Sequence, residues 1–256
     1  VHALPVVTAA NGGPYCGGQN IALSAGGAVS YNWSGPVAFS STQQNPVRNS
    51  ALGSYAGNYT VTGTDGNGCS NTATTTVAVN QVTPLITPSG PTTFCAGGSV
   101  DLTAGGGTSY LWSTGSSNAT ITVSSSGTYT VTVTSGSCTA TASQAVTVNP
   151  NPVANSGHST PTCQGTAITL TSSGGISYSW SGPNSFTSAQ QNPLLTNNAT
   201  SALDGTYTVT VTNAANCSAT ASTPITVNPN PLATASNTGP YCSGTNIQLN
   251  GGGGAS

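Results

Sequence analysis

Seven cysteines are the side chains of this sequence whose type and spacing most clearly indicate covalent chemistry. They fall into two series. The first-series cysteines stand 79, 68 and 79 residues apart, at Cys16, Cys95, Cys163 and Cys242. The second-series cysteines follow the first three of these, at Cys69, Cys138 and Cys217. Evenly repeated cysteine pairs are typical of disulfides formed in an oxidising, extracellular compartment.

The spacing favours one disulfide within each repeat. We predict the pairs Cys16–Cys69, Cys95–Cys138 and Cys163–Cys217. Cys242 then has no partner within this sequence. Closing the 53-residue loop of the first pair should contribute about 4 kcal/mol in the chain-entropy model. Zinc binding is the alternative, but zinc sites use close C-x2-C pairs and histidine ligands, which are missing around these cysteines. We therefore expect no metal site and no cofactor.

The remaining ionisable side chains offer little for catalysis. They are Arg48, Asp65, Asp101, Asp204, His2 and His158, besides the tyrosines. No aspartate has a second carboxylate in its own repeat for acid–base work, and a serine nucleophile needs a positioned base. Asp65 in Thr-Asp-Gly-Asn-Gly could begin a calcium turn, but Ca2+ needs six to eight oxygen ligands, so a hairpin turn fits better. We expect no catalytic residue and no enzymatic activity.

The same shortage of charge excludes two classes of partner. Nucleic-acid binding needs Lys and Arg to displace counterions from phosphates, and anionic membrane surfaces need the same side chains; the sequence has one Lys or Arg in total. No apolar run approaches the roughly 20 residues of a membrane-spanning helix. A surface with almost no charge promotes self-association. Copies of itself are therefore the expected partner.

The cysteines sit in a repeated pattern that must position them. A tryptophan follows each of the first three first-series cysteines by 17 residues, and a Tyr-Thr-Val-Thr string follows further on. Self-similarity at a fixed period indicates a tandem array of small domains. Each repeat has a single tryptophan, so we interpret these aromatics as core residues and not as a sugar-stacking platform. The predicted core aromatics are Trp33, Trp112, Trp180, Tyr59, Tyr129 and Tyr207.

Short strands separated by Gly, Asn, Ser and Pro turns predict an all-β sandwich in each repeat. The period-2 rule places Tyr and Val inward and Thr outward in the Tyr strands. No amphipathic helical period is present. The strands are expected at 20–24, 30–33, 59–62, 76–79, 120–123, 129–134, 145–148, 207–212 and 224–227.

Four segments follow from this pattern: repeat 1 (residues 1–80, long form, with the tail of a preceding repeat), repeat 2 (81–149, short form), repeat 3 (150–228, long form) and a truncated start of repeat 4 (229–256). The long repeats carry an extra loop or edge strand, 34–46 and 181–193. Residues 1–30 align with residues 227–256, which indicates a window on a longer array. Short Asn-Pro linkers should join the repeats semi-rigidly.

Outward-facing threonines and asparagines raise the question of surface modification. The threonine rows fit plain β-propensity on a solvent face; O-glycan attachment and packing against a neighbouring array are alternatives. N-x-Ser/Thr sequons, which become glycosylation sites where the producing cell has the machinery, begin at Asn32, Asn58, Asn118, Asn198 and Asn216. Glycans would provide the solvation that charges do not.

Several strings carry a resemblance to a known group of proteins: Tyr-Ser-Trp-Ser at 178–181, Gly-Thr-Tyr-Thr-Val-Thr-Val-Thr at 205–212 and Asn-Cys-Ser-Ala-Thr-Ala at 216–221. With their counterparts in repeats 1 and 2, they resemble the Ig-like and PKD-like tandem repeats of secreted Bacteroidota surface proteins, of the gliding-motility adhesin type. The resemblance spans nearly the whole chain. It implies tandem Ig-like β-sandwiches exported to the cell surface or beyond, with adhesive or structural duties.

These observations together predict a non-catalytic, structural segment of an extracellular or cell-surface fibre. The alternative is the spacer or stalk of a surface adhesin, with surface polysaccharide as a further partner. A fibre should self-associate, whereas a spacer should remain monomeric.

Overall fold

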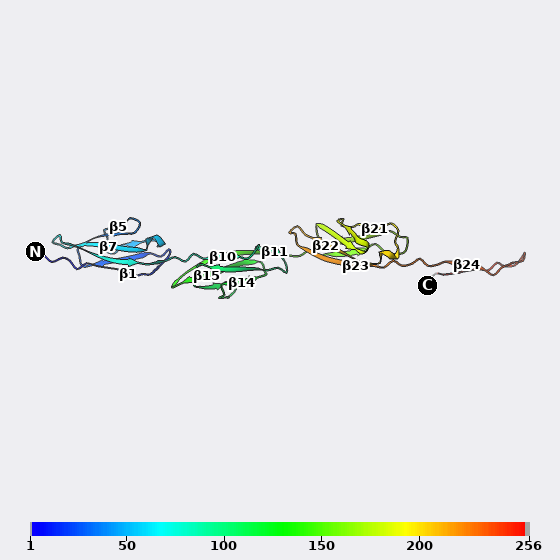
Figure 1. The fold of residues 1–256 in the computed structure, drawn as a ribbon, viewed down its shortest axis with the longest axis horizontal. Coiled ribbons are helices and arrows are strands. Elements are labelled where there is room, and N and C mark those ends of the chain that lie inside the picture. Colours follow the sequence, from blue (N-terminus) through cyan, green and yellow to red (C-terminus); the bar gives the residue numbers. More distant parts are fainter. Residues whose placement is uncertain (1, 254–256) are drawn as a thin grey trace. The chain divides into compact units, whose positions relative to one another are not determined.

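The computed structural model describes residues 2–253; the outer ends of the repeated segment, residue 1 and residues 254–256, lie outside the described residues. The chain divides into two compact units, Val1–Val148 and Asn149–Ser256. Figure 1 shows repeat 1 in blue to cyan, repeat 2 in green and repeat 3 in yellow to orange. No α-helix occurs in the described residues; strands and short 3-10 turns make up the regular structure.

Repeat 1 is a two-sheet sandwich. Its three-stranded sheet has the order β1 (Thr8–Asn11), β3 (Ile21–Gly26), β6 (Val47–Arg48). Its four-stranded sheet has the order β5 (Phe39–Ser41), β4 (Ser30–Gly35), β7 (Gly57–Thr64), β8 (Ser70–Val77). These pairings are antiparallel. A short parallel pair, β2 (Tyr15–Cys16) with β9 (Val79–Asn80), and the 3-10 turn η1 (Gly53–Tyr55) complete it.

Repeat 2 has the same two layers. Its three-stranded sheet has the order β10 (Leu85–Pro88), β12 (Val100–Gly105), β14 (Thr120–Val123). The other sheet has the order β11 (Thr93–Cys95), β16 (Cys138–Asn149), β15 (Gly127–Ser135), β13 (Ser109–Trp112). The fourth strand, β11, therefore lies on the opposite edge from the one that β5 occupies in repeat 1.

Repeat 3 returns to the long form. Its three-stranded sheet has the order β17 (Asn155–His158), β18 (Ile168–Ser173), β21 (Leu194–Thr196). Its four-stranded sheet has the order β20 (Phe186–Ser188), β19 (Ser177–Gly182), β22 (Gly205–Thr212), β23 (Ser218–Ile225). The 3-10 turns are η2 (Pro183–Ser185) and η3 (Ser201–Leu203). A solvent-exposed hairpin follows, β24 (Thr234–Asn237) with β25 (Leu249–Gly252).

Each sandwich encloses its own hydrophobic cluster, and within the described residues no cluster joins residues of two repeats. The tryptophans lie at the centres: Trp33, Trp112 and Trp180 are at most 2% exposed. Each indole Nε1–H donates to a backbone carbonyl 3.0 to 3.3 Å away. The polar edge of the ring is thereby satisfied while its large apolar surface stabilises a small core.

A tyrosine hydroxyl closes the same turn in all three repeats. Tyr59, Tyr129 and Tyr207 each donate to the backbone carbonyl four residues upstream, at 2.9 to 3.0 Å. This is the tyrosine corner found at the E–F turn of Ig-type sandwiches. With the paired three- and four-stranded sheets, it identifies the repeats as Ig-like domains in tandem.

The extra segment of the long repeats contains an edge strand, β5 or β20, which is one of the two forms expected of it, a loop being the other. Phe39 on β5 and Phe186 on β20 meet Tyr59 and Tyr207 edge to face, with ring centroids 5.3 and 5.7 Å apart. Both tyrosines are fully buried. Repeat 2 has no such strand, and its Tyr129 is only half-buried.

One group of strand predictions was displaced along the chain. The strand that pairs with the Tyr strand begins at or just after the second-series cysteine, in β8 (Ser70–Val77), β16 (Cys138–Asn149) and β23 (Ser218–Ile225), and not at 76, 145 or 224. These strands are rich in alanine, serine and threonine, and their small side chains give a weak hydrophobic pattern. Pairing along the whole length of the Tyr strand fixes them instead.

Candidate functional site

The most distinctive chemical feature of the molecule is a disulfide between two repeats. Cys16 of repeat 1 is bonded to Cys138 of repeat 2, with their Cα atoms 5.4 Å apart and a sequence separation of 122. The predicted pairs Cys16–Cys69 and Cys95–Cys138 are therefore wrong. The prediction of one bridge within each repeat fails because the two series of cysteines lie at different ends of a sandwich.

First-series cysteines lie beside the linker that follows their own repeat. Cys16 is the parallel β-partner of Asn80. The neighbouring Gly17 N–H donates to the Asn80 carbonyl at 3.0 Å. This long-range pairing brings a residue near the start of the repeat to the place where the chain leaves it.

Second-series cysteines lie beside the linker that precedes their repeat. Cys138 shares a small cavity of about 90 Å3 with Cys16 and with linker residues Asn80, Gln81 and Val82. In repeat 3, the Sγ of Cys217 is 3.9 Å from the carbonyl oxygen of Asn149. The linker between repeats 1 and 2 is therefore flanked by a first-series cysteine from one side and a second-series cysteine from the other.

Of the other five cysteines, two are in disulfides and three are free thiols. Cys95 and Cys217 are disulfide-bonded, and they stand the same 122 residues apart as Cys16 and Cys138. Cys69, Cys163 and Cys242 are free thiols. The predicted pair Cys163–Cys217 is therefore wrong as well.

The cavity at the disulfide does not have the size or lining of a ligand site. Small-molecule sites usually enclose about 300–1,000 Å3 and combine apolar walls with a few polar groups. This one is far smaller, and Thr139, Ala140 and Gly17 complete its lining. It has room for water beside the bridge.

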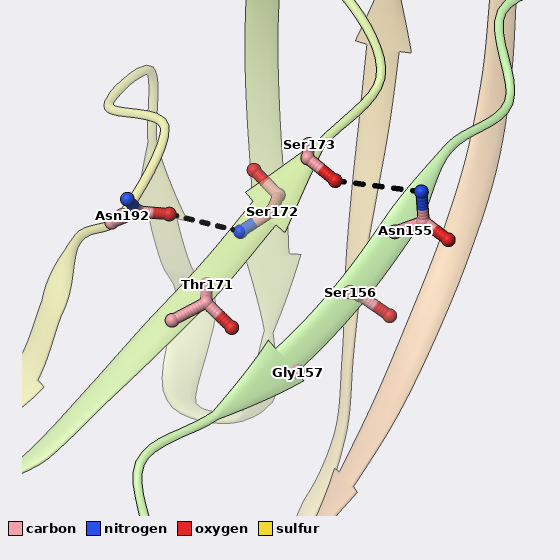
Figure 2. Close-up of a pocket in the computed structure, with 7 residues that line it drawn as sticks. All are labelled: Asn155, Ser156, Gly157, Thr171, Ser172, Ser173 and Asn192. Carbon is pink, nitrogen blue, oxygen red and sulfur yellow. Dashed lines mark hydrogen bonds between the residues drawn. The ribbon is translucent and has the colours of Figure 1, made fainter.

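A larger and shallower hollow of about 330 Å3 lies on the three-stranded sheet of repeat 3. Figure 2 shows its lining of neutral, small side chains: Asn155, Ser156, Gly157, Thr171, Ser172, Ser173 and Asn192. Asn192 Oδ1 accepts from the Ser172 N–H at 2.9 Å, and Asn155 Nδ2 donates to Ser173 Oγ at 3.4 Å. Its amides are thus already engaged by the fold, and none of the lining residues is charged or aromatic.

The charged side chains have structural roles. Arg48 donates to the Pro36 carbonyl at 2.7 Å and to the Tyr59 hydroxyl at 3.0 Å, and its guanidinium lies 3.4 Å from the centre of the Tyr55 ring. It therefore binds the 3-10 turn η1 to the edge of the four-stranded sheet through hydrogen bonds and a cation–π contact.

Each aspartate is a backbone or hydroxyl acceptor. Asp65 Oδ1 accepts from the N–H groups of Asn67 and Cys69, both at 2.9 Å, so this carboxylate closes the β7–β8 turn. Asp204 accepts from the Val227 N–H at 2.7 Å. Asp101 accepts from the Thr122 hydroxyl. No group of three or more His, Cys, Asp or Glu side chains in residues 2–253 is arranged to hold a metal ion.

Burial raises the pKa of Tyr207, and the nearby carboxylate of Asp204 raises that pKa further. Both effects disfavour the phenolate, since burial removes solvation and a second negative charge repels it. His158 makes a local contact through Nδ1 with the Ser159 carbonyl at 3.0 Å, and His2 is exposed.

The sequons and the threonine rows lie on the surface. All five sequon asparagines, Asn32, Asn58, Asn118, Asn198 and Asn216, are exposed. Hydroxyls of adjacent strands bond across the outer face, as in Thr60–Thr74 and Thr208–Ser222 at 3.0 and 2.8 Å. Such cross-strand pairs stabilise a sheet modestly. The tryptophans, in contrast, are buried and offer no stacking surface to a sugar.

No protein-family model matches this chain, and no curated protein matches it significantly. Among solved structures, the three N-terminal domains of the bacteriophage RB49 outer capsid protein Hoc are 15% identical, with a TM-score of 0.37 over 89% of this chain and 99% of that one. The I67–I69 fragment of titin is 13% identical, with a TM-score of 0.41 over 90% and 100%. The eight N-terminal Ig domains of DSCAM are 15% identical, with a TM-score of 0.33 over 98% and 39%.

Proposed function

We propose that this chain is a structural, non-catalytic segment of an extracellular or cell-surface fibre, in which tandem Ig-like repeats transmit tension. The observation that carries the proposal is the Cys16–Cys138 disulfide. It connects two repeats that have separate hydrophobic cores. Neither cysteine belongs to the hydrophobic cluster of its repeat, and the bond provides a second covalent connection across the joint.

Extracellular location is proposed on the same chemistry. Disulfides persist in secreted and surface proteins and are rare where cellular thiols keep cysteines reduced. No helix within residues 2–253 combines the length and apolar character needed to cross a bilayer. Glycans on the exposed sequon asparagines would solvate a surface that carries one cationic residue and three acidic ones.

Copies of the same chain are the proposed partners. The outer faces of the sheets present hydroxyls and amides with almost no charge to oppose close approach. Uncharged surfaces associate readily because no net repulsion keeps the molecules apart. Lateral packing of one array against another then requires no specialised site.

The test is electron microscopy of native material from the producing cells, with and without a reducing agent. Regular filaments with an axial repeat of one or a few sandwich lengths are expected in the untreated sample, and reductant should weaken or disperse them. Dispersed single chains that end in a bulky head would contradict the fibre and would establish an adhesin stalk instead.

A further inference from the structure

We propose that Cys69 and Cys163 are half-sites for disulfides to neighbouring Ig-like repeats outside the described sandwiches. The rule is that a first-series cysteine bonds the second-series cysteine of the repeat that follows it. Cys16–Cys138 obeys this rule. By the same rule, Cys163 takes a second-series cysteine from a following repeat, and Cys69 takes a first-series cysteine from a preceding one. This holds for a fibre and for a stalk alike.

Cys163 occupies the same backbone position as Cys16. It forms a parallel bridge with Asn228, as Cys16 does with Asn80. The following N–H, of Gln164, donates to the Asn228 carbonyl at 2.8 Å, and its counterpart in repeat 1 makes the same bond at 3.0 Å. Cys163 is a half-exposed free thiol. It is therefore held beside the linker that leaves repeat 3, in the geometry that the bonded Cys16 has in repeat 1.

Cys69 occupies the second-series position in repeat 1. Its N–H is held by Asp65 Oδ1 at 2.9 Å, and the N–H of Cys217 is held in the same way by Asn213 Oδ1 at 3.0 Å. Two residues on, Asn71 Nδ2 donates to the Pro5 carbonyl at 3.1 Å, so this turn contacts the segment that enters repeat 1. Asn213 likewise contacts the preceding linker of repeat 3, at the Pro150 carbonyl.

Neither Cys69 nor Cys163 can form a disulfide with the other cysteine of its own repeat, because that cysteine is already bonded. The first-series cysteine of repeat 1, Cys16, is already bonded to Cys138. The second-series cysteine of repeat 3, Cys217, is itself disulfide-bonded. Cys69 in repeat 1 and Cys163 in repeat 3 are therefore left as free thiols. For each of these two thiols, the rule places the bonding partner in another repeat.

The chemistry is a two-electron oxidation. Two thiols lose two protons and two electrons as the S–S bond forms, and the disulfide form of a thiol–disulfide oxidoreductase accepts them and becomes a dithiol. The partner is defined by its chemistry: a cysteine in an abutting Ig-like repeat of the same type. A continuation of the same chain and a second copy of it are the two sources that can supply that cysteine.

The first experiment maps disulfides in native material. Free thiols are blocked with iodoacetamide, the protein is digested with pepsin at acidic pH to prevent exchange, and linked peptides are identified by mass spectrometry. We expect Cys69 and Cys163 each in a disulfide with a peptide from another repeat. Carbamidomethylated Cys69 or Cys163, or the pairs Cys16–Cys69 and Cys163–Cys217, would overturn the proposal. Failure of the fibre proposal shows in the microscope and leaves this map unaffected.

The second experiment identifies the source of the partner. The 256-residue chain is produced in an oxidising periplasm and run on a non-reducing gel. Cross-linked oligomers that disappear in Cys69→Ser and in Cys163→Ser indicate a second copy. Monomers with alkylatable Cys69 and Cys163, beside linked cysteines in native material, indicate a continuing chain. Cys242→Ser is compared with them, because Cys242 is an exposed free thiol of the first series and the rule gives it a partner in a following repeat as well. Oligomers that vanish only in Cys242→Ser, with both other thiols free in native material, would count against the proposal.

Discussion

At the scale of single residues, glycine and tyrosine together explain why the Tyr corner of the long repeats is so tightly packed. The Tyr59 ring lies against Gly35, and the Tyr207 ring lies against Gly182. A Cβ at Gly35 would lie 2.6 Å from Cδ1 of Tyr59, and a Cβ at Gly182 would lie 2.3 Å from Cδ1 of Tyr207. Both distances are far inside van der Waals contact, so these glycines are required by close packing.

The substitution Gly35→Ala should therefore destabilise repeat 1. Overpacking a filled core costs about 1–3 kcal/mol, and the fully buried Tyr59 has no room to move away. Hydrogen exchange of peptides that cover β4 and β7 should accelerate by a matching factor of about 5 to 150. The control is Gly66→Ala, because nothing lies within 4 Å of a Cβ there. Equal exchange in the two variants would mean that Tyr59 is not held as described.

Because the pKa of Tyr207 is raised, we expect the free energy of unfolding to decrease at alkaline pH. The unfolded chain ionises near pH 10, while burial and Asp204 keep the folded Tyr207 neutral to a higher pH. Stability from this group is thus complete below pH 10 and falls as the pH rises towards the raised pKa. In Tyr207→Phe, the loss in urea midpoint between pH 9 and pH 11 should be smaller. The free thiols must be alkylated first, and identical slopes would contradict the assignment.

At the scale of elements, the Gln-Asn-Pro segment of the long repeats does more than connect two strands. Gln191 Nε2 donates to the Ser172 carbonyl at 2.8 Å, and Asn192 Oδ1 accepts from the Ser172 N–H at 2.9 Å. In repeat 1, Gln44 Nε2 likewise donates to the Ala25 carbonyl at 2.8 Å, and Asn45 Oδ1 accepts from the Ala25 N–H at 3.2 Å. Side-chain amides thus replace a backbone partner where β21 or β6 is too short to pair.

Removing the Asn192 side-chain amide should destabilise strand β18. Asn192→Ala leaves the nearly buried Ser172 N–H without an acceptor, which costs about 1–3 kcal/mol. Exchange of residues 168–173 on β18 should accelerate while repeat 2 remains unchanged. Gln190→Ala, an exposed neighbour in the same segment, is the matched control. Faster exchange in the control than in Asn192→Ala would show that the segment acts only through its backbone.

Much of this architecture can be predicted from the sequence, because alternation and repetition are local signals. The strands around Ile21, Trp33 and Tyr59 lie where the period-2 pattern indicates. The disulfide pairing cannot be predicted in this way. It depends on a parallel contact between Cys16 and Asn80, which brings together residues far apart in the chain and leaves no periodic trace. Spacing alone favoured the nearer cysteine.

At the scale of the whole molecule, Cys16–Cys138 stabilises the joint between repeats more than either fold. In Cys16→Ala/Cys138→Ala we expect native circular dichroism at 20 °C, because neither cysteine belongs to the hydrophobic cluster of its repeat. The chain-entropy model sets an upper limit of about 5 kcal/mol for closing a loop of this length, so the unfolding temperature should fall. Cys242→Ser should leave both readouts unchanged. An unfolded double variant would show that the bridge is needed for folding itself.

The same bridge has a consequence for survival in a hostile medium. The linker from Asn80 to Pro84 is an obvious target for a protease, since short exposed connections are cut before strands. A cut there leaves the two sides joined, because Cys16 lies before it and Cys138 after it. Cleavage and reduction must both occur before the pieces separate. A fibre built with this joint would therefore remain in one piece after a single backbone cut in the linker. It would shorten only where the disulfide beside the cut is also reduced, and that reduction is reversible by oxidation.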